Sequence, residues 1–440
     1  MAAKTKTKSN VKSKSKSEFL AACKTRLEPN REQRAALMNH AGAARFAYNW
    51  GLSVRQAAYD ADKTSLNAIS LHKLLNELKP TVYPWLYEVS KCAPQEALRD
   101  LDKAYKSWWR RLSEGKRGKR AGAPHYKSRL RDGIGGFRLT GVVKVLEGGY
   151  IQLPRLGKMK LSEKDYLPLG SYSQAMITEQ AGHWYVSVKA LPQHKLGKPK
   201  GRDPKSKAGL DLGLSSFLTF DNGHSDEAPK PLLSSLKKLR VLQRQQSRRK
   251  LGGANRRKTN QKIARLHARV TNQRQDFLHK LTTELTRTYA ALSVESLNVA
   301  GMMQNKCLSR AVADVGMGEF LRQLQYKSAW YGCRLITADQ WYPSTQICSN
   351  CHHRKEGREK LTLKDRTYHC HNCGLTLDRD INAARNLVQL IPATTKQQTL
   401  LRLKSLGRSQ TPEGGRSAGT GNSQCETPLV DPGTVVTCVA

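Results

Sequence analysis

Apolar residues recur along the chain either at every second position, as in strands, or at intervals of three and four, as in helices. In the first half, this pattern predicts helices and short strands. Residues 18–29 alternate between apolar and polar side chains up to Pro29, which predicts one strand. Residues 30–115 carry apolar and aromatic residues at intervals of three and four, which predicts helices. Between Phe137 and Leu191, short alternating runs are separated by turn sequences such as EGGY and QAGHW. Short strands with frequent turns are typical of a small β-barrel.

In the second half, predicted strands alternate with predicted helices. The segment AGLDLGLSSFLTFDNG predicts a hairpin, and the segments ALSVESL and RLITADQWY predict two further short strands. Residues 230–290 predict one or two long helices, and GEFLRQLQYKSAWYGC predicts another. The long helices carry an apolar seam formed by Ile263, Leu266, Val270, Phe277, Leu281 and Leu285. The apolar face of the last predicted helix is formed by Ile381, Ala384, Val388 and Ile391.

The charge of the chain indicates a polyanionic partner. Its 440 residues include 76 Lys and Arg against 35 Asp and Glu, which gives a formal net charge of +41. Such an excess favours nucleic acid as the partner. A membrane surface is the alternative, but no apolar run approaches the roughly 20 residues that a spanning helix needs. The basic N-terminus lacks an apolar core, so it does not resemble a secretory signal; a transit or nuclear address is the alternative to a disordered tail.

Two segments are candidates for contact with nucleic acid. Between Lys237 and Lys280 the chain has fifteen Lys or Arg and one acid, which exceeds the mixed charge of an ordinary solvated helix. The basic stretch from Tyr105 to Tyr126 is interleaved with aromatic residues that could stack on bases. Its residues Trp108 and Trp109 could equally belong to a core, and the sequence leaves both interpretations open.

Four of the ten cysteines predict a metal site. Cys348 and Cys351 form one Cys-x-x-Cys pair, Cys370 and Cys373 form another, and 18 residues separate the pairs. This spacing is that of a zinc ribbon, in which four thiolates fill a tetrahedron and leave no open position, so the Zn²⁺ would be structural. The other six cysteines have unrelated spacings, which favours a reducing, cytosolic compartment over a disulfide framework. A histidine could replace one cysteine as a ligand, and the candidates are His352, His353, His369 and His371.

Carboxylates at three places predict a second, catalytic site. Asp211 and Glu295 each lie inside an apolar predicted strand, where a carboxylate is costly unless it turns to solvent or binds a metal. Asp378 and Asp380 open the last helix, where either could simply cap it. A strand acid, a second strand acid and a helix acid follow in the order of an RNase H-like nuclease. Such sites hold two divalent ions about 4 Å apart, and oxygen ligands suit Mg²⁺ or Mn²⁺.

These motifs together resemble those of a known family. The segments GLDLGLSSFL, LSVESLNVAGM, FLRQLQYKSAWYGC, the cysteine pairs and LDRDINAARNL resemble successive motifs of the TnpB (OrfB) proteins of bacterial insertion sequences, relatives of type V CRISPR effectors. The segments RLEPNREQRAAL, ARFAYNW, GAPHYKSRLRDG and IQLPRLGKMKL extend the resemblance to the first half, over roughly residues 20–395. His352 is a departure, because the family often has glycine there.

The resemblance implies a function and a set of site residues. It implies an RNA-guided DNA endonuclease of a transposable element, acting with a noncoding guide RNA on double-stranded DNA that carries a short adjacent motif, in the prokaryotic cytoplasm at the nucleoid. Asp211, Glu295 and Asp380 would be catalytic and would bind Mg²⁺ or Mn²⁺. Asp380 is preferred to Asp378 because it precedes Asn382 in the family's D-x-N-A-A pattern. A catalytically silent RNA-guided regulator and a transposase that joins DNA ends are the alternatives.

The predicted fold class is α+β and multidomain. A wedge β-barrel with an inserted helical recognition domain precedes a RuvC-like, RNase H-like nuclease domain with an inserted zinc ribbon. The expected boundaries are a disordered basic tail at 1–17, the first barrel strand at 18–29, the helical domain at 30–115, the rest of the barrel at 116–191, a linker at 192–207, the first two nuclease motifs at 208–340, the ribbon at 341–376, the third nuclease motif at 377–395 and a disordered tail at 396–440.

Overall fold

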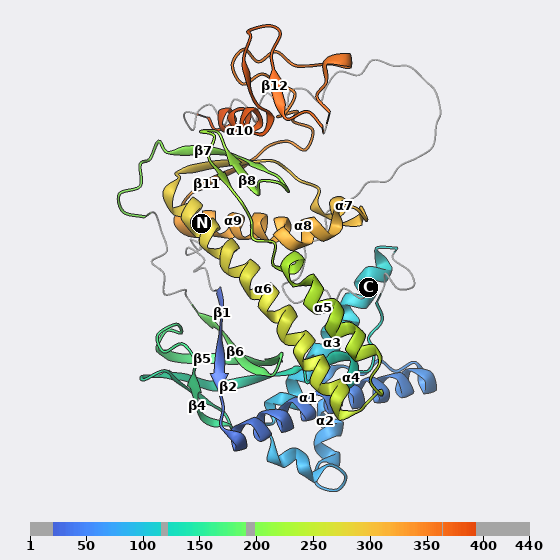
Figure 1. Ribbon diagram of the computed structural model, residues 1–440. Helices are drawn as coiled ribbons and strands as arrows, with labels where there is room; N and C mark the ends of the chain where they lie inside the picture. Colours follow the sequence, from blue (N-terminus) through green and yellow to red (C-terminus); the bar gives the residue numbers. More distant parts are fainter. Residues whose placement is uncertain (1–20, 116–121, 191–198, 363, 393–440) are drawn as a thin grey trace, which may run out of the picture. The chain divides into compact units, whose positions relative to one another are not determined.

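Figure 1 shows the computed structural model, which describes residues 21–115, 122–190, 199–362 and 364–392. The two predicted tails, 1–17 and 396–440, lie outside these residues, as do residues 192–198 of the predicted linker at 192–207. The helices and strands described below all belong to a compact unit that ends at Ile391. Within the described residues, no helix is both long and apolar enough to cross a membrane.

The first half contains a closed six-stranded barrel with strand order β1-β4-β3-β2-β5-β6. Alternate residues of β1, Cys23, Thr25 and Leu27, are buried because successive side chains of a strand point to opposite faces. The neighbouring strands of the barrel are all antiparallel. The strands are β1 (Ala21–Glu28), β2 (Gly136–Leu146), β3 (Tyr150–Leu153), β4 (Gly157–Leu161), β5 (Gly170–Gln180) and β6 (His183–Ala190).

A helical region is inserted between β1 and β2, as the sequence predicts. Asn30 begins the first helix with a capping box, in which its side chain and that of Gln33 each bond the other's backbone N–H. Gly51 lets two helices approach closely, because a Cβ there would lie 2.5 Å from Leu98 Cδ2. The helices are α1 (Arg31–Asp62), α2 (Ala68–Leu78), the 3₁₀ helix η1 (Pro84–Glu88), α3 (Cys92–Ser113) and the short α4 (Arg129–Asp132).

The second half is built on a five-stranded sheet with the order β11-β10-β7-β8-β9. Strand β10 pairs in parallel with β7 and β11, while β8 is antiparallel to β7 and β9. The strands are β7 (Lys207–Leu212), β8 (Leu218–Phe220), β9 (Ser225–Asp226), β10 (Ala291–Val294) and β11 (Arg334–Thr337). The helices are α5 (Pro231–Ser247), α6 (Ala254–Thr288), α7 (Val299–Gln304), α8 (Ser309–Val315), α9 (Met317–Tyr331) and α10 (Arg379–Gln389).

A small ribbon lies in the chain between β11 and α10. It contains the 3₁₀ helix η3 (Gly357–Glu359) and an antiparallel pair, β12 (Thr367–His369) and β13 (Thr376–Asp378). Tyr368 is fully buried and packs with Cys348 and Cys370, which gives the ribbon a minimal core of its own. A core this small needs a further constraint, such as a bound metal, to hold its shape.

The structure corrects the predicted seam of the long helices. Val270, Leu281 and Leu285 of α6 are buried as expected, whereas the predicted Ile263, Leu266 and Phe277 are only half-buried. Leu278, which the prediction omitted, is fully buried in the core beneath the sheet. Helix α6 packs chiefly against α5 and α9, and Phe277 packs against the core of the sheet region while staying partly exposed.

Two further predictions about the sheet region are wrong. Strand β10 ends at Val294, so Glu295 follows the strand and does not lie inside it. Helix α10 ends at Gln389, so Ile391 is buried as expected but lies beyond the helix. The predicted Ile381 and Val388 are half-buried, and the buried positions of α10 are Asn382, Ala383, Ala384, Asn386 and Leu387.

Candidate functional site

The last helix, α10, is held against the central strand β7 at a glycine. A Cβ at Gly209 would lie 2.0 Å from the carbonyl oxygen of Ala384 and 2.6 Å from the amide nitrogen of Val388. No side chain larger than hydrogen fits there, so the glycine allows backbone to pack on backbone. Asp211 follows two residues later on the same strand, which brings it to the helix that carries Asp380.

Asp211 and Glu295 come together through the register of two parallel strands. Val294 is paired with Leu210, so the next residues in each chain segment, Glu295 and Asp211, stand level at the carboxyl ends of β10 and β7. Asp211 is only 7% exposed. Burial raises its pKa well above the usual value, and the charges of Glu295 and Asp380 raise it further.

The Asp211 carboxylate has no direct counter-charge. In the part of the chain that the structure describes, it accepts no hydrogen bond and forms no ion pair; Arg379 acts on it only through space. A buried, ionisable carboxylate without a partner, beside two other acids, is costly in a protein that binds nothing. A divalent cation would remove that cost, so the three residues fit a metal with oxygen ligands.

Glu295 is positioned by a serine that the sequence prediction omitted. Ser344 is buried in the segment between β11 and the first cysteine pair, and its hydroxyl donates a hydrogen bond to Glu295 Oε1. Burial raises the pKa of Glu295, and this hydrogen bond partly offsets the rise. The serine is 49 residues from its partner, so no local sequence signal identifies the pair.

The structure separates the two acids at the start of α10. Asp378 is the N-cap residue, and its side chain accepts hydrogen bonds from the backbone N–H of Asp380 (2.8 Å) and of Ile381 (3.2 Å). Asp380, in the first turn, accepts hydrogen bonds from Arg379 Nε (3.2 Å) and Nη2 (3.1 Å). Arg366 of the ribbon lies 3.8 Å from its other oxygen. The capping geometry predicted for this pair is therefore found at Asp378.

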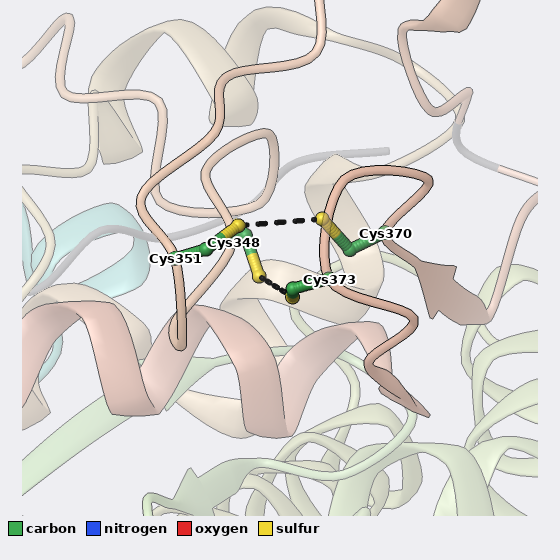
Figure 2. A group of neighbouring side chains, drawn as sticks. All are labelled: Cys348, Cys351, Cys370 and Cys373. Carbon is green, nitrogen blue, oxygen red and sulfur yellow. Dashed lines mark hydrogen bonds between the residues drawn. The ribbon is translucent and has the colours of Figure 1, made fainter.

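The four cysteines form a compact cluster, which Figure 2 shows with one pair on each of two loops. All four Sγ atoms lie within 4.8 Å of one another, and the distances Cys348–Cys373 and Cys351–Cys370 are both 3.6 Å. Four sulfurs at about 2.3 Å from one Zn²⁺ in a tetrahedron lie about 3.8 Å apart. None of the four is in a disulfide, so the cluster fits a single zinc ion.

Within the described residues, these cysteines are the one group of three or more His, Cys, Asp or Glu whose ligand atoms come together as a metal site. The oxygens of Asp211, Glu295 and Asp380 do not come that close to one another. The four histidines are not part of the cluster either: His369 bonds Thr376 Oγ1 at 2.8 Å, and His353 lies 3.7 Å from Glu359. His352 has a φ of 60°, a conformation that favours glycine.

Two asparagines of α10 attach the ribbon to the sheet region. Asn382 Nδ2 donates to the Ile347 carbonyl (2.7 Å), and Asn382 Oδ1 accepts from Ser349 N–H (2.9 Å). Asn386 Nδ2 donates to the carbonyls of Ser344 (2.8 Å) and Ile347 (2.6 Å). Both asparagines are fully buried. Asn382 stands out in the sequence as part of the D-x-N-A-A motif, and two asparagines four residues apart on one face of an amphipathic helix are a further signal, because buried polar groups are normally hydrogen-bonded.

The basic run on α5 and α6 lies largely on the surface. Of its fifteen Lys and Arg, Arg249 and Arg256 bond backbone carbonyls within the α5–α6 hairpin, and Arg274 pairs with Asp314. The other twelve are exposed. In the helical region, Trp108 is half-buried and Trp109 is 53% exposed, and their ring centroids lie 4.8 Å apart. More than half of Trp109 is thus open to solvent, and the residue does not lie in the core.

Comparison with protein families finds matches over much of the chain. Residues 186–306 match the family model OrfB_IS605, described as a probable transposase, and residues 318–387 match the TNB domain described as Cas12f1-like. Residues 19–64 match a model described as a helix-turn-helix domain. From residue 21 on, where the described part of the chain begins, this range contains β1 and the single long helix α1.

Relatives and a solved structure agree with these matches. A Streptomyces pristinaespiralis protein named "Putative RNA-guided DNA endonuclease" is 33% identical over 371 residues, which are 83% of this chain and 88% of the relative. Escherichia coli InsQ, which carries the same description, is 31% identical over 387 residues, 84% and 92% of the two chains. A Cas12f1–sgRNA–target DNA complex gives a TM-score of 0.51 at 15% identity, over 82% of this chain and 83% of the other. The likeness to Cas12f1 confirms the predicted fold class. The 33% and 31% identity to the two relatives, each over more than four fifths of both chains, shows that the chain belongs to the TnpB (OrfB) family of insertion-sequence proteins.

Proposed function

We propose that the protein is an RNA-guided DNA endonuclease of a transposable element, which hydrolyses phosphodiester bonds at Asp211, Glu295 and Asp380. The printed names of its relatives support the guided nuclease activity. The observation that carries the assignment of the site is the buried Asp211 carboxylate, which has no counter-charge and stands beside two further acids.

Each acid has a distinct environment in the proposed reaction. Asp211 and Glu295 would present oxygens from adjacent strand ends, and Asp380 would add a third from the helix; together they would hold Mg²⁺ or Mn²⁺. Ions bound there would supply an activated water and stabilise the leaving oxygen. Ser344 holds Glu295 in place, and the Asp378 cap fixes the first turn of α10. Arg379 neutralises Asp380 until a cation binds.

The remaining regions would serve the two nucleic-acid partners. A guide RNA would pair with the target and supply sequence specificity, while the protein reads the shape and charge of the hybrid. The barrel and the helical domain, with the boundaries 18–29, 30–115 and 116–191, would hold the short motif beside the target. The exposed lysines and arginines of α5 and α6 would contact phosphates, which positions a strand without reading it. The zinc ribbon would be structural, and the protein would act on nucleoid DNA.

The test is to rewrite the guide. The full chain is supplied with RNA whose guide segment has been changed, and with two DNA duplexes in Mg²⁺, one matched to each guide. We expect cleavage to follow the guide and to require RNA. Cleavage that ignores the guide, or strand transfer in place of breaks, would favour the transposase alternative. Guided binding without any cleavage would favour the silent regulator.

A further inference from the structure

Trp341 is an exposed aromatic residue beside the proposed nuclease site. At 83% exposure it is the most exposed large hydrophobic side chain among the described residues. Its chain neighbours Asp339 and Gln340 are polar and exposed. An indole that stands alone in a polar segment lacks the contiguous apolar patch that a protein partner would bury. Most of the surface of this aromatic side chain is open to solvent.

The segment that carries Trp341 is fixed by its own hydrogen bonds. The backbone N–H of Trp341 donates to Asp339 Oδ1 at 2.9 Å, and the backbone N–H of Tyr342 donates to the Asp339 carbonyl at 3.0 Å. The Tyr342 hydroxyl reaches the Asn386 carbonyl of α10 at 3.4 Å. The backbone that carries the tryptophan is therefore held in position before any ligand binds, which lowers the entropy cost of a contact.

The same segment leads directly into the proposed site. Ser344, three residues after Trp341, donates the hydrogen bond that positions Glu295. Three residues of chain span at most about 11 Å. A nucleic-acid strand whose phosphate lies at Glu295 therefore has its neighbouring bases within reach of the indole.

We propose that Trp341 is a positioning residue that stacks on an unpaired nucleobase of the strand held at the acids. Within a duplex, both faces of a base are covered by neighbouring pairs, so an indole can stack only on a base that is unpaired or terminal. Stacking tolerates any sequence, because every base has an aromatic face. This suits an enzyme whose specificity comes from a guide. The inference rests on the proposed function.

The test separates stacking from cleavage. The full chain with Asp211→Ala, carrying its RNA, is titrated with single-stranded DNA in which one 2-aminopurine is placed at successive positions. We expect the 2-aminopurine emission to fall at a few adjacent positions. Trp341→Leu should abolish that quenching and weaken single-strand binding by about 5- to 160-fold, the range for loss of one stacked base. Trp341→Tyr, which keeps an aromatic face, should retain both.

Leu308→Ala is the control, because Leu308 is an exposed apolar residue between α7 and α8, outside the basic segment 237–280; it should change neither readout. With Asp211 intact, Trp341→Leu should slow cleavage and Trp341→Tyr should not. Quenching and binding that are unchanged in Trp341→Leu would overturn the stacking proposal, whatever the cleavage result. Loss of quenching in Trp341→Leu, with no cleavage by the parent, would support stacking and contradict the nuclease assignment instead.

Discussion

The cysteine cluster and the carboxylate cluster, which consists of Asp211, Glu295 and Asp380, are both connected to α10. Of the two, only the cysteine cluster already has the distances of a metal site. The four sulfurs already lie at separations that suit one zinc ion. The three acids do not form such a group, and Asp380 is paired with Arg379 instead. The cysteines come from two tight turns close in sequence, whereas the acids come from three separate elements and repel one another. A structural site can be preformed, whereas the proposed catalytic site of like charges would need its cation to draw it together.

The largest expected effect concerns the carboxylates. Asp211→Ala should reduce guided cleavage by more than the 10- to 100-fold that loss of an outer ligand partner costs, because it removes a proposed ligand itself. Binding of RNA and DNA should be retained, since the exposed basic surface is unchanged. Gel assays of cleavage and of binding on the same preparation measure the two quantities. Glu295→Ala should behave in the same way, and cleavage at the parental rate by either variant would remove that acid from the site.

The next effect concerns zinc. Cys370→Ser leaves three thiolates, and the ribbon should lose its metal and its local fold, because metal binding and folding are linked at such sites. Elemental analysis should find one zinc per parent chain and a marked loss in the variant, together with loss of target cleavage. Cys307→Ser is the control, since Cys307 is an exposed free cysteine outside the cluster. A parent protein without zinc would contradict the assignment.

A third effect tests the connection between the clusters. Asn386→Ala removes the amide that donates to the Ser344 and Ile347 carbonyls, and a buried acceptor left unpaired costs about 1–3 kcal/mol. We expect lower stability and slower cleavage, because Ser344 also holds Glu295. Gln389→Ala, which removes an exposed hydrogen bond to Ser349, should cost much less. Calorimetric unfolding of the two variants makes the comparison, and equal stability would mean that α10 does not join the clusters.

A fourth effect is on pH dependence without Mg²⁺. The pKa values of Asp211 and Glu295 are both raised in the folded protein, so the folded state binds these protons more tightly than the unfolded state does. Their contribution to stability is present below the unfolded pKa values, about 3.9 and 4.3, and is lost as the pH rises through the higher folded values. Added Mg²⁺ should therefore raise the melting temperature near pH 7 and much less near pH 4. Asp211→Asn should weaken both dependences, and a parent protein with neither would contradict the proposed cation site.

The two clusters also differ in how much of their structure can be predicted from nearby sequence. The cysteine cluster follows from spacing within 26 residues, and the barrel, the inserted helices and the sheet strands follow from local periodicity. The roles of Ser344 and Asn386 depend on hydrogen bonds to residues 49 and 42 positions away, which no local pattern contains. The end of β10 before Glu295 was missed because the apolar run continues past it. Gly209 in GLDLG could be recognised as a glycine in a strand, but not as the contact point of α10.

The smallest effect separates Asp378 from Asp380. Asp378 caps α10, so Asp378→Ala should cost about 0.5–2 kcal/mol of stability and reduce cleavage only as far as the first turn of the helix frays. Asp378→Ser retains a capping oxygen without the charge and should restore most of the stability. Asp380→Ala removes no cap, yet it should lose most of the cleavage, because its carboxylate is the third proposed ligand. Measuring unfolding and cleavage for all three variants gives opposite patterns for the two positions. Normal cleavage by Asp380→Ala together with inactive Asp378→Ala and Asp378→Ser would reverse the choice of the third acid.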